Sequence, residues 1–193
     1  PFVSVKVIEP SRGWRMLNLK EFWAYRELLS VLVQRDIKVR YKQSVLGVTW
    51  VILRPLVSMA IFTLVFGIFA RIPSDGYPYP LFVFAGLLPW IYFSTAVLSS
   101  GGSLVASAGL VSKIYFPRLI IPVASVAGGL LDLFISMAFL LLAMPFFGTG
   151  WTSNLLAVPV LVLGVVVTAL GVGTFISALT VAYRDFGSIA AYA

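Results

Sequence analysis

The sequence predicts an all-α membrane protein, in which an N-terminal amphipathic helix at the membrane surface precedes a bundle of transmembrane helices. Hydrophobic residues make up 60% of the 193-residue chain, charged residues only 11%, and the mean hydropathy is +1.01. A soluble domain carries about 25% charged residues. The uncharged runs are long enough for several membrane spans with short connections, and they leave no room for a separate soluble catalytic domain.

Composition also excludes several kinds of chemistry. The chain contains no cysteine and no histidine, so disulfides, thiol chemistry, imidazole bases and the commonest metal ligands are absent, and we expect no metal site. No phosphate-binding Gly-Lys motif is present, so we expect no ATP site in this chain. The net charge of +7 is better explained by basic cytoplasmic loops than by nucleic-acid binding. The first 20 residues lack the apolar core of a signal peptide.

Residues 21–42 predict an amphipathic helix, and residues 1–20 predict a cytoplasmic extension before it. At about 100° per residue, the apolar side chains fall on one arc and the polar ones on the opposite arc. A helix with such a basic outer face is typical of an anionic inner leaflet. The apolar arc holds Phe22, Tyr25, Leu28, Leu29, Leu32, Val33 and Val39, and the polar arc holds Glu27, Gln34, Arg35, Lys38 and Lys42.

Two charges, Asp36 and Arg40, fall on the apolar side of this helix, four residues apart. This spacing allows them to pair with each other, which stabilises an isolated helix by about 0.2–0.5 kcal/mol. A simple solvated face does not explain the pair. We therefore give equal weight to a second interpretation, in which Asp36 and Arg40 contact another protein element.

Four spans are predicted at about residues 45–70, 81–104, 119–146 and 155–181. At about 1.5 Å per residue, each can cross a hydrocarbon core of about 30 Å. The last six residues, SIAAYA, resemble the start of another apolar segment. We therefore expect the transmembrane domain, residues 21–193, to be incomplete at its C-terminus.

The distribution of Lys and Arg predicts that the chain starts in the cytoplasm. Nine of these residues lie in the first 42 positions, and three more follow on the same predicted side at Lys113, Arg118 and Arg184. On the other side lies Arg71, while Arg54 lies within the first span. The predicted location is the cytoplasmic, or inner, membrane of a bacterium.

The predicted membrane region holds two notable ionisable residues, Arg54 and Asp132. A charge at the centre of a span costs about 2.5–3.5 kcal/mol on the insertion scale, so such residues usually face protein or water. We expect Asp132 to be bonded to a helix neighbour or to Arg54. A proton relay is the weaker alternative, because the chain offers no further series of ionisable residues.

Three segments, in order, resemble the signatures of one family of transporters. They are RDIKVRYKQSVLGVTWVILRPL (residues 35–56), LVSKIYFPRLIIP (residues 110–122) and AYRDF (residues 182–186). Together they are similar to the ABC-2-type permeases that export polysaccharides and polyol phosphates, such as the O-antigen, capsule and teichoic acid exporters. The resemblance implies a homodimer of permeases, each bound to a separate cytoplasmic ATPase that carries ATP and Mg²⁺, moving a lipid-linked glycan outward.

The resemblance also implies which residues meet the ATPase. Residues 21–42 resemble the interfacial gate helix of the family, residues 110–118 resemble its coupling helix, and residues 183–186 resemble a second cytoplasmic contact. The candidate contact residues are Arg35, Asp36, Arg40, Lys113, Phe116, Pro117, Arg118, Arg184 and Asp185.

Aromatic side chains are the candidates for the glycan path, because sugars stack on rings without being held tightly. For each ring, packing or a place in the lipid interface is at least as good an interpretation. The six candidates are Trp50, Phe62, Phe66, Trp90, Tyr92 and Phe93.

The chain departs from the family in one respect, because the family has six spans and this sequence predicts four. Two other functional classes stay open. An ion-coupled secondary transporter would use Asp132, and a membrane enzyme of glycan or lipid assembly would need a catalytic constellation that the sequence does not supply.

Overall fold

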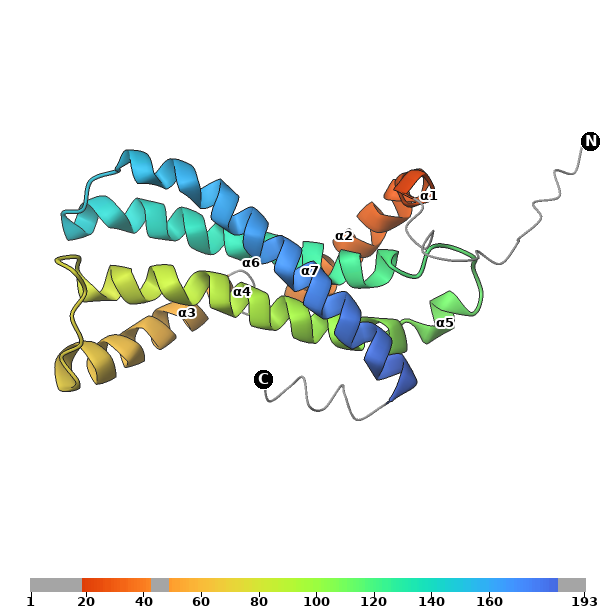
Figure 1. The fold of residues 1–193 in the computed structure, drawn as a ribbon, viewed down its shortest axis with the longest axis horizontal. Helices are drawn as coiled ribbons and strands as arrows, with labels where there is room; N and C mark the ends of the chain where they lie inside the picture. The colour runs from red at the N-terminus through yellow and green to blue at the C-terminus, as the bar shows by residue number, and fades with distance from the viewer. Residues whose placement is uncertain (1–18, 43–48, 184–193) are drawn as a thin grey trace, which may run out of the picture.

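The described part of the chain is a bundle of helices joined by turns and loops (Figure 1). The structure is a computed structural model, and it describes residues 19–42 and 49–183. Four helical stretches in these ranges are long and apolar enough to cross a membrane, as the sequence predicted. They are α3 (Thr49–Phe62) with the π-helical η1 (Thr63–Phe69), α4 (Tyr79–Ala106), α6 (Ile120–Ala143) with the 3-10 turn η2 (Met144–Phe147), and α7 (Val158–Ala182) preceded by η3 (Ser153–Ala157).

Helix α4 forms the centre of the bundle, because it contacts α3, α6 and α7. Its inward side chains include Phe84, Leu88 and Tyr92, which belong to the larger apolar core. The ring of Phe84 meets that of Phe139 on α6 edge to face, with the ring centroids 5.9 Å apart. Aromatic pairs favour this arrangement, since the edge of one ring is positive and the face of the other is negative.

Small residues bring α4 and α7 close together. A Cβ atom added to Gly173 on α7 would lie 2.9 Å from both Cβ and Oγ of Ser100 on α4. A Cβ atom added to Gly101 would lie 2.9 Å from Ile176. Gly101 thus marks a close helix approach, whereas its neighbour Gly102 faces open space. Contact through small residues is the usual way in which membrane helices associate, because lipid supplies no hydrophobic force between them.

One polar side chain compensates for a proline inside a helix. A proline has no N–H, so the carbonyl four residues before it loses its helical partner. Pro55 in α3 leaves the carbonyl of Val51 in this state, and Ser136 Oγ of α6 donates a hydrogen bond to that oxygen at 3.2 Å. An unsatisfied carbonyl is costly in lipid, and this hydrogen bond removes that cost. Because its donor is on α6 and its acceptor on α3, the bond also holds the two helices together.

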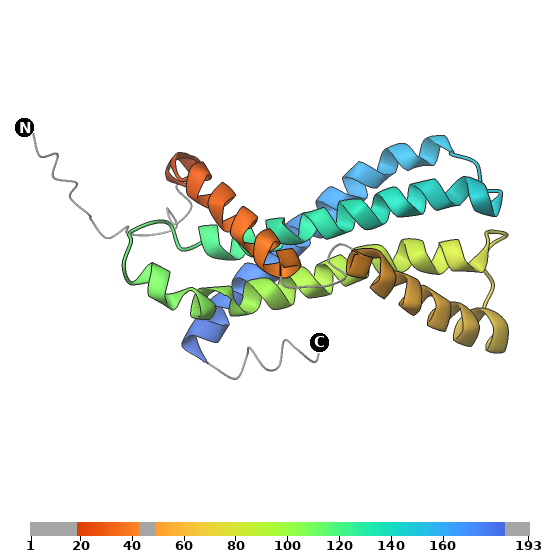
Figure 2. The same cartoon turned by 180° about the vertical axis from the view of Figure 1, so that it is seen from behind.

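The predicted helix over residues 21–42 is two helices, α1 (Leu19–Ala24) and α2 (Arg26–Lys42), which meet at a turn at Tyr25. Figure 2 shows α2 running obliquely across the bundle, beside α6, as an interfacial helix would. Its polar arc is exposed, as predicted. Val39 is an exception on the apolar arc, because its side chain is 66% exposed.

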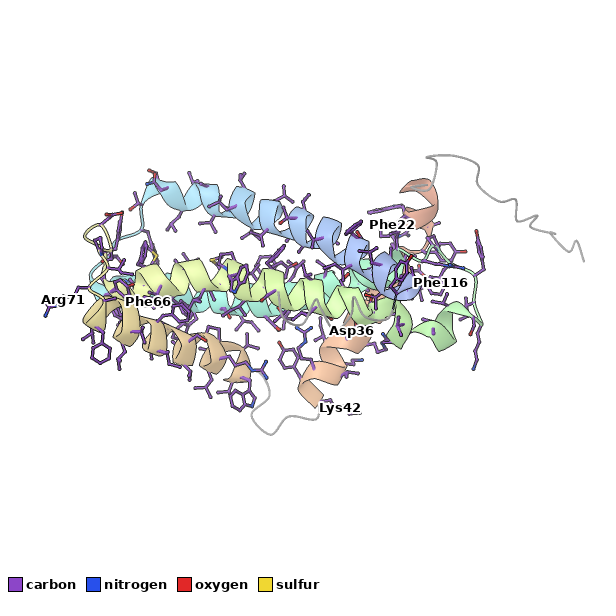
Figure 3. The ribbon with its side chains drawn as sticks, turned by 60° about the horizontal axis from the view of Figure 1, so that its bottom comes forward. Phe22, Asp36, Lys42, Phe66, Arg71 and Phe116 are labelled. Atoms are coloured by element: carbon purple, nitrogen blue, oxygen red, sulfur yellow. The ribbon has the colours of Figure 1, made fainter. Side chains whose placement is uncertain are left out.

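Protein, not open space, covers most of the apolar arc of α2. Leu32 packs with Phe116, Ile120 and Ile121 in a second core cluster, which joins α2 to the start of α6. Tyr25 Oη donates a hydrogen bond of 3.4 Å to the carbonyl of Tyr115. Figure 3 shows Phe22 and Phe116 at this end of the molecule. The periodicity identified the buried face correctly, but it carried no information about the partner that buries it.

The connection between α4 and α6 differs from the expected helix over residues 110–118. A single helical turn, α5 (Ala108–Val111), is followed by turns and loop up to the start of α6. Pro117 lies in this stretch, and proline disfavours helix in the residue before it. The connection lies at the α1 end of the molecule, whereas Arg71 and Phe66 lie at the opposite end (Figure 3).

Candidate functional site

A cavity of about 310 Å³ lies where the end of α2 meets the spans α3, α4 and α6. Its volume is at the lower end of the range of ligand sites in proteins. The cavity combines three charged side chains with aromatic and aliphatic walls. It is lined by Arg40, Tyr41, Trp50, Val51, Arg54, Pro55, Leu88, Ile91, Tyr92, Thr95, Asp132, Leu133 and Ser136.

Asp132 of α6 receives two donors from adjacent residues of α2. Its Oδ2 lies 2.5 Å from Nη1 of Arg40, and its Oδ1 accepts a hydrogen bond from the hydroxyl of Tyr41. The side chains of Arg40 and Asp132 are 35% and 32% exposed, so the pair is partly shielded from solvent. The intact pair contributes only a modest net stabilisation. Removing one member would leave the other as a partly buried charge without a partner, and this costs more free energy than the pair contributes.

Tyr41 acts as a neutral donor in this arrangement. Partial burial, followed by the hydrogen bond to Asp132, raises the pKa of Tyr41 well above its usual range. The phenol therefore keeps its proton at neutral pH and continues to donate to the carboxylate.

The prediction that Asp132 bonds to a helix neighbour is confirmed, and the neighbour is α2. The alternative partner, Arg54, is not the one the structure shows. Pairing of Asp36 with Arg40 within α2 is wrong, because Asp36 pairs with Arg35 at 3.0 Å. Both residues do contact another element, since Asp36 also lies against Gly128 of α6, whose added Cβ would be 3.6 Å from that of Asp36.

Arg54 has no carboxylate partner in the described part of the chain. Its guanidinium carbon lies 5.9 Å from the ring centroid of Trp50, one helical turn earlier. Such a cation–π contact contributes about 0.5–1 kcal/mol at an exposed site. It orients the guanidinium but leaves its positive charge in place.

The six aromatic candidates do not form one surface within this chain. Trp50 and Tyr92 line the cavity, although Tyr92 is only 3% exposed and donates a hydrogen bond to the carbonyl of Val126 at 3.3 Å. Phe62 and Phe66 line a separate apolar groove of about 670 Å³ next to Tyr79. The remaining pair, Trp90 and Phe93, has ring centroids 6.2 Å apart and lines neither space.

The candidate ATPase contacts separate into exposed and buried residues. Lys113 and Arg118 are exposed on the connection after α5, and Pro117 is half-buried. Phe116 points inward and is only 5% exposed, so it packs beneath α2. Arg35, Asp36 and Arg40 line a groove of about 700 Å³ between α2 and the ends of α4 and α6. Arg184 and Asp185 lie outside the described residues.

Two contributors to the site were missed from the sequence. Tyr41 carries no signal of its own in the pattern, since an aromatic residue next to Arg40 suits any interfacial helix. Ser136 could have been found in part, because Pro55 shows that one carbonyl of α3 needs an outside donor. Which hydroxyl supplies that donor depends on the packing of α3 against α6.

These features define a multi-pass helical membrane protein. Its surface helix α2 is joined to the span α6 by the partly buried ion pair between Arg40 and Asp132. The chain belongs to the ABC-2 type transporter family, whose model matches residues 27–192. It is 34% identical over 173 residues to the O-antigen export system permease protein RfbA of Myxococcus xanthus, covering 89% of this chain and 65% of that protein.

Further relatives carry similar names. The chain is 31% identical over 160 residues to an O-antigen export system permease protein RfbA of Klebsiella pneumoniae, covering 82% of this chain and 61% of the relative. It is 29% identical over 89 residues to the polysialic acid transport protein KpsM of Escherichia coli, covering 46% and 34% respectively. The chain thus spans less than two thirds of the length of the relatives that it matches.

Proposed function

We propose that this chain is part of the permease subunit of an ABC exporter that moves a lipid-linked polysaccharide out across the cytoplasmic membrane. The observation that carries the proposal is the family match over residues 27–192, together with relatives named for O-antigen export and polysialic acid transport. The substrate class is an O-antigen-like, capsular or teichoic-acid-like glycan on a lipid carrier. The chain itself holds no ATP site, and ATP with Mg²⁺ binds to a separate ATPase subunit.

The distribution of charge supports an orientation with the N-terminus in the cytoplasm of a bacterial cell. Arg26 begins α2 next to α1, and the exposed Lys113 and Arg118 lie on the connection after α5. Phe116, on the same connection, is at the opposite end of the molecule from Arg71 (Figure 3). Lys and Arg are enriched on the cytoplasmic side of membrane proteins.

One composite surface at the α5 end is suited to contact the ATPase. The second core cluster and the Tyr25–Tyr115 hydrogen bond hold α2 against the connection after α5. The buried ring of Phe116 packs in this cluster and so anchors the loop that carries Lys113 and Arg118. A movement of the ATPase against this loop would therefore also move α2, and through Arg40 and Asp132 the wall of the cavity.

A second copy of the permease completes the proposed exporter. The spans of one chain expose many large apolar side chains, among them Phe62, Phe66 and Trp90. We propose that some of these rings face the partner copy and the glycan, and that the others face lipid. In this arrangement the six aromatic candidates form a path only when two copies are assembled.

The ion-coupled alternative has less support. Asp132 is occupied by both Arg40 and Tyr41, which is the arrangement of a structural carboxylate and not of an open ion site. A membrane enzyme also has less support, since the relatives are named as permease and transport proteins.

Export in cells tests the proposal. The full-length permease is expressed, with the ATPase encoded beside it, in a bacterium whose own O-antigen permease has been deleted. We expect surface polysaccharide to appear with the active ATPase and to be absent with an ATPase that cannot hydrolyse ATP. Export that continues with the inactive ATPase would contradict the proposal, and would point to an ion-coupled mechanism if it collapsed with the proton gradient.

A further inference from the structure

We propose that the cavity between α2, α3, α4 and α6 binds the phosphate group of a lipid carrier, with Arg54 as the binding cation and Asp132 as the residue that limits the charge of the site. The inference rests on the proposed function, because it names the part of the lipid-linked substrate that this chain would hold. It concerns the phosphate next to the lipid and not the sugars.

The first step is the charge of the cavity. It is lined by two guanidinium groups and one carboxylate. Asp132 and Arg40 neutralise each other at 2.5 Å, whereas Arg54 has no carboxylate partner among the described residues. Counted over the described residues, the lining of the cavity therefore carries one uncompensated positive charge. Such a charge is unfavourable beside the apolar walls of the cavity, and a bound anion would offset that cost.

The second step is the supply of donors. The hydroxyl of Thr95 donates to the carbonyl of Ile91 at 2.6 Å, and that of Ser136 donates to the carbonyl of Val51. The hydroxyl of Tyr41 donates to Asp132. The side-chain hydroxyls of the cavity thus donate within the protein, and the guanidinium of Arg54 is the cation of the lining that has no carboxylate partner among the described residues. Its planar, forked geometry fits two phosphate oxygens at once.

The third step is the depth of the site. Arg54 lies five residues after Thr49, the first described residue of α3, which corresponds to a rise of about 7.5 Å. Arg40 and Tyr41 lie in the last turn of the surface helix α2. The cavity therefore lies beside the junction of the surface helix and the first span, although its residues on α4 and α6, Tyr92 and Asp132, are near the middle of those helices. A lipid phosphate at the membrane surface would enter the cavity from this junction. The remaining wall of the cavity is apolar, with Leu88, Ile91 and Leu133, and suits the start of a lipid chain.

Binding to the purified full-length permease in detergent, without ATPase, tests this site. The probes are a polyprenyl monophosphate, the polyprenol without phosphate, an ordinary anionic phospholipid and inorganic phosphate. We expect the polyprenyl phosphate to bind and the polyprenol to bind at least tenfold more weakly. Arg54→Gln should weaken polyprenyl phosphate binding by about 10- to 100-fold, the loss expected for a hydrogen bond to a charged group. Arg54→Lys should recover part of it.

A second variant separates binding from a merely structural role. Asp132→Asn frees the charge of Arg40, so we expect tighter binding of polyprenyl phosphate, while Asp132→Asn with Arg40→Gln should return it to the original value. A purely structural role predicts weaker binding in both. Arg71→Gln, at the other end of the molecule, is the control and should leave binding unchanged.

Several results would overturn the site. Equal binding of polyprenol, or no effect of Arg54→Gln, would show that phosphate is not recognised there. Competition by inorganic phosphate or by the phospholipid as strong as that by polyprenyl phosphate would remove the lipid carrier as its ligand. These outcomes are independent of the export test, because they need neither ATPase nor transport, and ATPase-dependent export could persist with the site disproved.

Discussion

Arg40 and Asp132 are 92 residues apart in the chain, yet Nη1 of the first lies 2.5 Å from Oδ2 of the second. This contact joins the end of the surface helix α2 to the middle of the span α6. It also forms one wall of the cavity that contains Arg54. Surface helix, span and cavity therefore cannot move independently at this point.

The ion pair should stabilise the docking of α2. Arg40→Ala or Asp132→Ala should each lower the free energy of unfolding by about 1–3 kcal/mol, because each leaves a partly buried charge without its partner. The double variant should cost less than the sum of the two single variants. Thermal unfolding of the purified protein measures this cycle. Arg35→Ala is the control, since its pair with Asp36 is more exposed and should contribute less than about 1 kcal/mol. Strict additivity would mean that the two residues do not interact.

An engineered disulfide should form between Asp36→Cys on α2 and Gly128→Cys on α6. The Cβ atoms would lie 3.6 Å apart, which falls within the normal range for a disulfide. The natural chain has no cysteine, so a change in mobility on a non-reducing gel reports this bond alone. Asp36→Cys with Gly86→Cys is the control, because Gly86 has open space around it and should give no intramolecular bond. If the proposed coupling is right, the disulfide should also stop export until a reductant is added.

Gly173 should tolerate no side chain. In Gly173→Ala, the new Cβ would lie 2.9 Å from Ser100, and overpacking of this kind costs about 1–3 kcal/mol. Gly171→Ala on the same helix is a matched control with open space, and it should have little effect on the unfolding temperature. Adding Ser100→Gly to Gly173→Ala should recover stability, because it removes the clashing atoms. Equal effects of the two alanine variants would contradict the close approach of α4 and α7.

Phe116 and its neighbour Tyr115 should behave differently. Phe116 is 5% exposed and Tyr115 is 57% exposed. Phe116→Ala should cost about 3–5 kcal/mol of stability, as for other large buried rings, and should loosen α2. Tyr115→Ala should cost much less, since its side chain is in the open and only its carbonyl accepts the bond from Tyr25. Proteolysis of α2 in folded protein, followed by mass spectrometry, would report the loosening. Equal protease sensitivity would argue against Phe116 as the residue that anchors α2.

Charge reversal on the loop after α5 tests the proposed ATPase surface. Lys113→Glu with Arg118→Glu should reduce co-purification of the ATPase and uncouple ATP hydrolysis from export, because both residues are exposed where contact is proposed. The double variant should nevertheless unfold at nearly the same temperature as the unaltered protein. Arg71→Glu, at the opposite end, should leave assembly intact. Normal assembly and export in the double variant would count strongly against this surface.

The buried face of α2 and the existence of four spans could be predicted from the sequence, and the partners of single side chains could not. The spacing of Asp36 and Arg40 allowed a local pair or contact with another element, and it could not show that Arg40 takes its carboxylate from α6. The aromatic rings could be listed as candidates, yet their separation into a charged cavity, an apolar groove and a third pair depends on the side of each helix that faces a neighbour.

By itself, the sequence determined the class of protein, the number of membrane-length helices and the amphipathic surface helix. These features depend on the transfer of apolar side chains out of water and on helical periodicity, both of which act within short segments. Only the tertiary structure decided that Asp132 neutralises Arg40 and that Arg54 has no carboxylate partner within residues 19–42 and 49–183. Either arginine could have neutralised that carboxylate, and the choice follows from which helices pack together, a matter of long-range contact that no local pattern contains.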